Sequence, residues 1–238
     1  MIGCLSLRVL KRLTFHTVSF NVVGLKLKFV ATNQCLERPV MYAGLRKIEK
    51  RLGHDNFPLI PFNYYSSYQE MVISPEFPCV AKIGHAHRGM GKMKLNDSTQ
   101  WADIRTVIAL NDTYSTVEPF INVEYGIRVQ KIGTHVRIFK KNMSGSSWKS
   151  QFGGSSLEEM EIKDETLLKK YRQWVEVCAS EFDLDILAVD ALHDKSGKEY
   201  IIELNDSAIG LTTGYWEKDT IHIVDLCIDK IQQEVLHK

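Results

Sequence analysis

Cysteine and proline are scarce in this chain of 238 residues, which holds five cysteines and six prolines. The cysteines are widely spaced and form no CxxC pair, which excludes a structural zinc knuckle and a dense disulfide framework and suits a reducing cytosol. With so few prolines, the chain carries no proline-rich tail.

Excess charge and long apolar runs are lacking too. Thirty Lys and Arg against 29 Asp and Glu give a net charge of +1, which argues against nucleic-acid binding through bulk charge. No apolar run approaches the ~20 residues that span a bilayer, so no transmembrane segment is expected. Length and composition predict a globular protein, either one large domain or two small lobes.

Acidic residues are absent from the first 36 positions, where the charged side chains are all basic. A basic, hydroxyl-bearing and acid-free stretch is typical of a mitochondrial targeting peptide. Apolar residues also alternate between Val18 and Phe29, with a break at Gly24, which predicts a basic strand pair. We favour the strand pair, and treat residues 1–34 as an atypical basic N-terminal segment.

Residues 35–76 are expected to form a helix, begun by Pro39 and stopped by Gly53, followed by an extended connector. Alternating strands and amphipathic helices follow from residue 77, one helix being capped by Ser98. The last helix is expected to begin near Lys218. Its inward-facing stripe is expected to be Ile221, Val224, Ile228 and Ile231.

A glycine-rich loop, residues 84–91, separates a strand that ends in Lys82 from a strand that begins at Lys92. Closely spaced glycines let backbone N–H groups approach phosphate oxygens, and a cation at the rim neutralises charge. A P-loop would need Ser or Thr after the lysine and then a helix, which this loop lacks. The pattern fits a flap over a triphosphate or a plain hairpin loop, while His85 and His87 alone do not make a zinc site.

Two carboxylates form a second signal. Asp190 lies on one strand and Glu203 on the next, across a short turn, so the two are expected side by side, with Asn205 on the face of Glu203. Mg²⁺ is held by such oxygens beside phosphates. Solvent-facing edge carboxylates are the alternative, but the apolar runs around them favour a buried pair, which would need a cation to offset its repulsion.

Scattered cations form a third signal, and surface charge is the simplest interpretation of each one alone. Their combination with the glycine loop and the acid pair favours a site. They are Arg38, Lys82, Lys92, Arg128, Lys131, Lys141 and Lys149.

The order of these elements resembles an ATP-grasp nucleotide site, and the amino-acid sequence of several segments resembles the central domain of the synapsin family. The resemblance runs from about Cys35 to the C-terminus. It rests on FPCVAKIGHAHRGMGK (77–92), EPFI (118–121), RVQKIG (128–133), WK (148–149) and DILAVDALH (185–193), the GHAH-x-GMGK stretch being highly specific.

The resemblance implies an α/β ATP-grasp fold of two lobes, with antiparallel sheets, flanking helices and ATP in the cleft between them. The small lobe would span about 77–121 and the large lobe about 122–238. ATP with Mg²⁺ or Ca²⁺ would be the cofactor, with Asp190, Glu203 and Asn205 on the metal. The implied ATP-binding residues are Arg38, Lys82, Gly84, Gly89, Gly91, Lys92, Glu118, Pro119, Phe120, Ile121, Arg128 and Lys149.

In function, the resemblance implies an ATP-binding regulator of vesicle clustering and neurotransmitter release, cytoplasmic and peripheral on synaptic vesicles at the presynaptic terminal. Its implied partners are the vesicle surface, cytoskeletal proteins and a homo-oligomer. The sequence departs from the family pattern at Gly126, where an acidic residue is usual, and at Asp190, where glutamate is usual. The alternative is an ATP-grasp ligase that forms an acylphosphate from a carboxylate and couples it to an amine.

Overall fold

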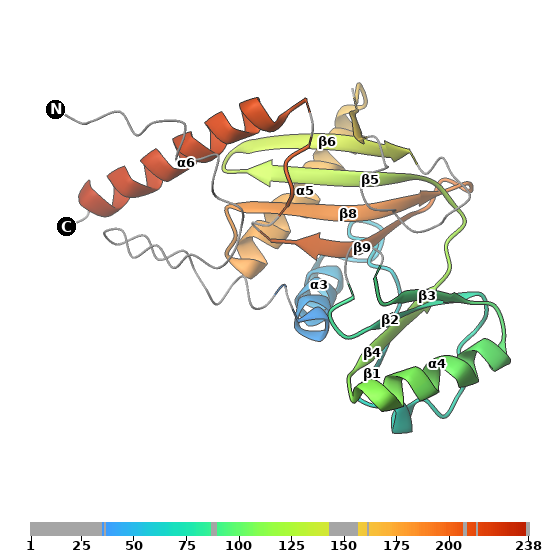
Figure 1. The fold of residues 1–238 in the computed structure, drawn as a ribbon. Helices are drawn as coiled ribbons and strands as arrows, with labels where there is room; N and C mark the ends of the chain where they lie inside the picture. The colour runs from blue at the N-terminus through green and yellow to red at the C-terminus, as the bar shows by residue number, and fades with distance from the viewer. Residues whose placement is uncertain are drawn as a thin grey trace.

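The computed structural model of the protein describes residue 35 and residues 37–86, 90–142, 157–160, 162–206, 209–212 and 214–236. The expectations for residues 1–34, Gly89 and Lys149 lie outside these residues. Two antiparallel sheets, each flanked by helices, make up the fold (Figure 1). The α/β architecture with two sheets is therefore confirmed.

The smaller sheet has the strand order β1-β4-β2-β3 and lies below the larger one in Figure 1. Helix α4 packs on it through Trp101, Ile104 and Ile108. The cap of α4 is Asp97 rather than Ser98, because the Asp97 carboxylate accepts the backbone N–H of Gln100. The elements are β1 (Asn63–Tyr65), η1 (Tyr68–Glu70), β2 (Cys79–Ile83), β3 (Lys92–Leu95), α4 (Ser98–Asn111) and β4 (Ser115–Pro119).

The larger sheet has the order β7-β6-β5-β8-β9. Its back face packs on two helices, α3 and α5, whose apolar stripes fill the main core around Leu45, Trp174 and Val189. Helix α3 is buried against this sheet through apolar residues at helical spacing, among them Met41 and Ile48. The elements are α3 (Arg38–Leu52), β5 (Val123–Ile132), β6 (His135–Asn142), β7 (Leu157–Glu159), α5 (Glu165–Phe182), β8 (Ile186–Asp194) and β9 (Glu199–Asn205).

The expected orientation of the last helix, α6 (Trp216–Leu236), is wrong. The four residues expected to face inward are 38–59% exposed. The sheet is instead contacted from another side of the helix, where Asp219 is buried and Ile223 packs beside the small cluster of Ile132, Ala188 and Ile209. Because α6 has apolar residues on two sides, its periodicity could not show which side would be covered.

Two further properties of the described residues bear on the class of protein. None of their helices has the length and apolarity needed to cross a membrane. The four cysteines among them are all free thiols, as the wide spacing predicts.

Candidate functional site

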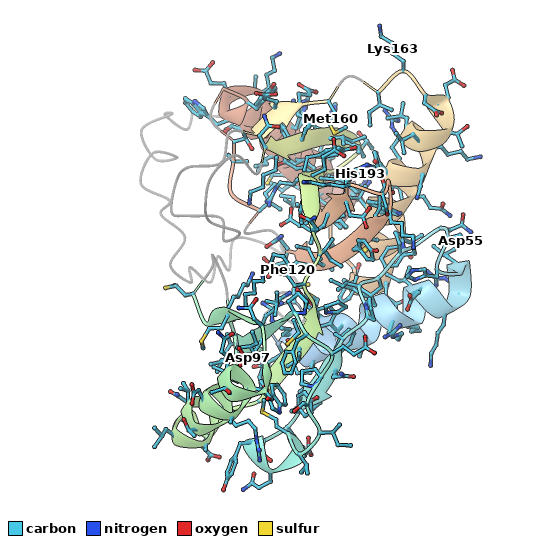
Figure 2. The ribbon with its side chains drawn as sticks, turned by 90° about the vertical axis from the view of Figure 1, so that its right-hand side faces the viewer. Asp55, Asp97, Phe120, Met160, Lys163 and His193 are labelled. Carbon is cyan, nitrogen blue, oxygen red and sulfur yellow. The ribbon has the colours of Figure 1, made fainter. Side chains whose placement is uncertain are left out.

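The expected site residues gather where the two sheets meet, beside the first turn of α3. The small sheet contributes β2, β3 and β4, and the large sheet contributes β5, β8 and β9. Figure 2 shows Phe120 at the passage of the chain from one sheet to the other. The Lys94 ammonium lies over the Phe120 ring in a cation–π contact, 3.8 Å from the ring centroid.

A buried ion pair anchors the small-sheet side of the site. Lys82 Nζ lies 2.6 Å from Glu118 Oε1, and both side chains are less than a tenth exposed. Tyr42, buried on α3, brings its hydroxyl 3.2 Å from Glu118 Oε2 and 2.9 Å from the Ile202 carbonyl oxygen, and Lys82 donates to it at 3.4 Å. The Tyr42 hydroxyl thus contacts residues of both sheets.

Two lysines face each other at the end of the β2–β3 hairpin. Lys82 is the cross-strand partner of Lys92, an arrangement of like charges that is unfavourable without counter-ions. Lys92 Nζ lies 3.6 Å from Glu203 Oε2, on the edge strand of the other sheet. Arg38 Nη2 lies 3.4 Å from Glu203 Oε1 and donates to the Ala86 carbonyl oxygen.

The large sheet presents a row of charged residues across three strands. Arg128, Asp190 and Glu203 are successive cross-strand partners on β5, β8 and β9, so their side chains share one face. Arg128 Nη1 lies 3.2 Å from both carboxylate oxygens of Asp190, and Asn205 donates to Asp190 Oδ2 at 2.8 Å. The adjacency of Asp190 and Glu203 matches the register expected from the short turn between their strands.

The cations that offset the carboxylate pair are supplied by the chain itself, so the charge of the pair alone does not require a bound ion. Asp190 is paired with Arg128, and Glu203 with Arg38 and Lys92. Burial alone would raise the pKa of Glu203, but Lys92, Arg38 and Lys82 outweigh it and hold that pKa below its usual value. Glu203 is therefore ionised at neutral pH.

The expected loop glycines have a backbone role. Gly84 and Gly91 have φ angles of +50° and +64°, in the left-handed region that favours glycine, and they close the β2–β3 hairpin. This conformation fits a flap and an ordinary hairpin equally well. Among the residues expected at the adenine edge, Glu118 is buried, Pro119 is exposed, and Phe120 and Ile121 are half-buried.

Two residues of the site were missed by sequence reasoning. Tyr42 belongs to an apolar helix stripe, and its hydroxyl partners come from distant strands, so no local pattern marks it. From the sequence, Lys141 is one of the scattered cations and has no assigned role, yet in the structure Asp190 and Glu203 raise its pKa against the lowering effect of burial. The available signal was its position in the hairpin, opposite Gly126.

Replacing Tyr42 by phenylalanine is expected to lower the free energy of unfolding by about 1–3 kcal/mol. The ring shape is kept, but the buried hydroxyl that donates its one proton to Glu118 or to the Ile202 carbonyl oxygen is lost. Urea denaturation measures the loss. Tyr64→Phe, on a ring 46% exposed, should change stability by less than about 0.5 kcal/mol. Equal losses in the two variants would show that the Tyr42 hydroxyl does not stabilise the junction.

The site has more positive than negative charge. Among the described residues, five basic side chains (Arg38, Lys82, Lys92, Arg128 and Lys141) face three carboxylates (Glu118, Asp190 and Glu203), a surplus of two. Buried Nε atoms of Arg38 and Arg128 have no hydrogen-bond acceptor there. Such a site can bind a polyanion with two net negative charges and several acceptor oxygens.

The family of the synapsin ATP-binding domain matches residues 28–233 of the chain. Over 204 residues, the chain is 30% identical to synapsin of Drosophila melanogaster. The aligned region covers 84% of this chain and 19% of that protein. The chain thus spans about a fifth of the length of this relative.

Solved structures share the fold. A D-alanine–D-alanine ligase from Bacillus anthracis, complexed with ATP, is similar with a TM-score of 0.61 at 13% identity, over 88% of this chain and 70% of that one. The ATP-grasp ligase PsnB is similar with a TM-score of 0.51 at 20% identity, over 75% of this chain and 54% of that one. The two-sheet architecture is therefore that of the ATP-grasp fold.

Proposed function

Because the chain belongs to the synapsin family, we propose that it binds ATP between its two sheets and acts as a regulator rather than as an enzyme. The regulated process is the clustering of synaptic vesicles and the release of neurotransmitter. Its place is the cytoplasm of the presynaptic terminal, peripheral on the vesicle surface, with cytoskeletal proteins and a second copy of the chain as further partners.

The surplus of two positive charges is the observation that carries the ATP proposal. A triphosphate with one divalent ion has about two net negative charges at neutral pH, so it would leave the site balanced. Lys82, Lys92 and Arg38 come from three different elements and converge on Glu118 and Glu203. An anion lying among these groups would gain charge-assisted hydrogen bonds in a partly desolvated place.

Each expected residue then has a proposed role. Lys82 contacts the adenine and α-phosphate side, and residues 118–121 line the adenine edge. Lys92 reaches the phosphates from the hairpin, with Arg38 and Arg128 beside it. Gly84 and Gly91 shape the flap. Gly89 and Lys149, outside the described residues, are assigned to the flap and to the phosphate end by resemblance to the family.

The proposed divalent ion, Mg²⁺ or Ca²⁺, has a fitting donor set in Asp190, Glu203 and Asn205. Two carboxylates and an amide are hard oxygen donors, and Mg²⁺ usually takes one or two carboxylates together with phosphate oxygens. The described residues contain no cluster of three or more His, Cys, Asp or Glu, so phosphates would complete the coordination. When bound, the ion would neutralise phosphate charge, and Arg128 and Lys92 would hold the carboxylates in place.

A ligase activity is the second candidate, favoured by the fold shared with the two ligases above. It would require a place for a carboxylate and an amine beside the terminal phosphate. Incubation of the protein with ATP, Mg²⁺ and mixtures of amino acids separates the two candidates. A regulator binds ATP and releases no ADP above a slow background, whereas ADP release that requires an acid and an amine would establish the ligase.

Thermal denaturation with and without ATP gives a first test of the binding proposal. Ligand that binds only the folded state raises the melting temperature, and at 100 times the dissociation constant it adds about 2.7 kcal/mol. We expect ATP with Mg²⁺ to raise the melting temperature and AMP to raise it less. No shift with millimolar ATP would contradict the proposal.

We propose that ATP binding needs only the region from residue 35 onward, with the two lobes meeting near residue 121. None of the residues assigned above lies in 1–34. A version of the chain that begins at Gln34 is expected to fold and to bind ATP with the affinity of the full chain, as measured by calorimetry. If the shortened protein folds and does not bind, the N-terminal segment contributes to the site.

A further inference from the structure

Lys141, on β6, is one of the five basic side chains of the site, and no contact with the nucleotide has been assigned to it. It is the cross-strand partner of Gly126, and Gly126 is two residues from Arg128 on β5. Since side chains of paired residues share a face and alternate along a strand, Lys141 shares the face of Arg128 and Asp190. Its neighbour Lys140 has its ammonium 4.4 Å from the ring centroid of Tyr125 and belongs to the opposite face.

Gly126 provides the space for the lysine stem. A Cβ atom placed on Gly126 would lie 3.2 Å from Lys141 Cβ and 3.6 Å from its Cδ, so the stem runs closely along the bare backbone of β5. The first distance is tighter than ordinary van der Waals contact. A side chain at position 126 would therefore displace the stem, and glycine keeps Lys141 low over the sheet.

The surroundings of the Lys141 ammonium carry both signs of charge. Burial lowers its pKa, Asp190 on β8 raises it, and Arg128 on β5 and Lys92 on β3 lower it further, while Glu203 on β9 raises it. The net effect is a pKa below the usual lysine value. A cation held among other cations and partly out of water gains most when an additional anion is placed beside it.

We propose that Lys141 is a nucleotide-binding residue that contacts the β- and γ-phosphates, and that Gly126 is the position that admits it. This inference rests on the proposed function. Lys141 shares the face of Asp190 and Arg128 on the large sheet, whereas Lys82 and Glu118 lie on the small sheet. The distal phosphates are the part of the nucleotide that the proposed metal carboxylates hold, so Lys141 lies at that end.

Calorimetric titration of full-length Lys141→Gln and Lys140→Gln with ATP, ADP and AMP, each with Mg²⁺, tests the assignment. Loss of one charge-assisted contact should lower ATP affinity by about 10- to 100-fold, ADP affinity by less and AMP affinity not at all. Lys140→Gln should match the wild type, and Lys141→Arg should keep most of the affinity. An equal loss for all three nucleotides in Lys141→Gln would overturn the assignment, because it would show a general distortion of the site.

These experiments distinguish a failure of the proposed function from a failure of the Lys141 assignment. Wild-type protein that binds no nucleotide would overturn the proposed function, and the role of Lys141 with it. Wild-type protein that binds ATP, with the same affinity in Lys141→Gln, would overturn the role of Lys141 alone.

Discussion

Lys82→Met is expected to weaken ATP binding by about 10- to 150-fold. The Lys82 ammonium is fixed by Glu118 at 2.6 Å and is almost completely buried, so its position needs no ordering when the nucleotide arrives. A desolvated charge-assisted hydrogen bond is among the strongest single contacts that a protein offers to a phosphate. Calorimetric titration with ATP and Mg²⁺ measures the loss.

The control for Lys82→Met is Lys131→Met. Lys131 is also a nearly buried lysine in an ion pair, 2.8 Å from Glu176, and it lies on the α5 side of the large sheet. The Lys131→Met protein should bind ATP with the affinity of the wild type. Because Lys82→Met leaves Glu118 buried without its cation, folding is checked by circular dichroism, and Lys82→Met/Glu118→Gln avoids the stranded charge. Unchanged ATP affinity in folded Lys82→Met would contradict the assignment of Lys82.

Glu203→Gln should abolish most of the dependence of ATP affinity on Mg²⁺ and leave weak binding that ignores the ion. Glu203 is ionised at neutral pH, shares a row with Asp190, and lies where three cations converge. The change to glutamine keeps the shape and removes one of the two carboxylates offered to the ion. The measurement is ATP affinity with Mg²⁺, with Ca²⁺ and with a chelator.

Glu199→Gln is the matched control for Glu203→Gln. Glu199 lies on the same strand, its side chain is 7% exposed, and its carboxylate is paired with Lys170 at 2.9 Å beside α5. Its replacement should cost stability and leave the metal dependence of ATP binding as in the wild type. A dependence on Mg²⁺ that survives unchanged in Glu203→Gln would show that this carboxylate does not hold the ion.

Local patterns in the sequence predicted most of the framework of the site. The strand that carries Lys82, the hairpin glycines and the adjacency of Asp190 and Glu203 follow from short-range rules on alternation and turns. These features depend on residues less than about 15 positions apart. Such spacing fixes register, and register fixes which side chains share a face.

Contacts between distant segments could not be predicted in the same way. Tyr42 lies on a helix, and its hydroxyl contacts both β4 and β9. In the sequence, Tyr42 is indistinguishable from the other residues of an apolar helix stripe. Arg38 and Lys92 neutralise Glu203 from separate elements, so the balance of charge emerged only once the sheets were placed together. The exposed apolar stripe of α6 shows the same limit. Periodicity identifies an apolar helix face, but it does not show which part of the protein packs against that face.

Calorimetric titration of the wild-type protein with ATP, first with Mg²⁺ and then with excess chelator, tests the central claim most directly. We expect saturable binding of one ATP per chain with Mg²⁺, and a substantial loss of affinity with chelator. Binding that is indifferent to chelator would contradict the metal site, and the absence of saturable binding in both conditions would contradict the nucleotide site itself.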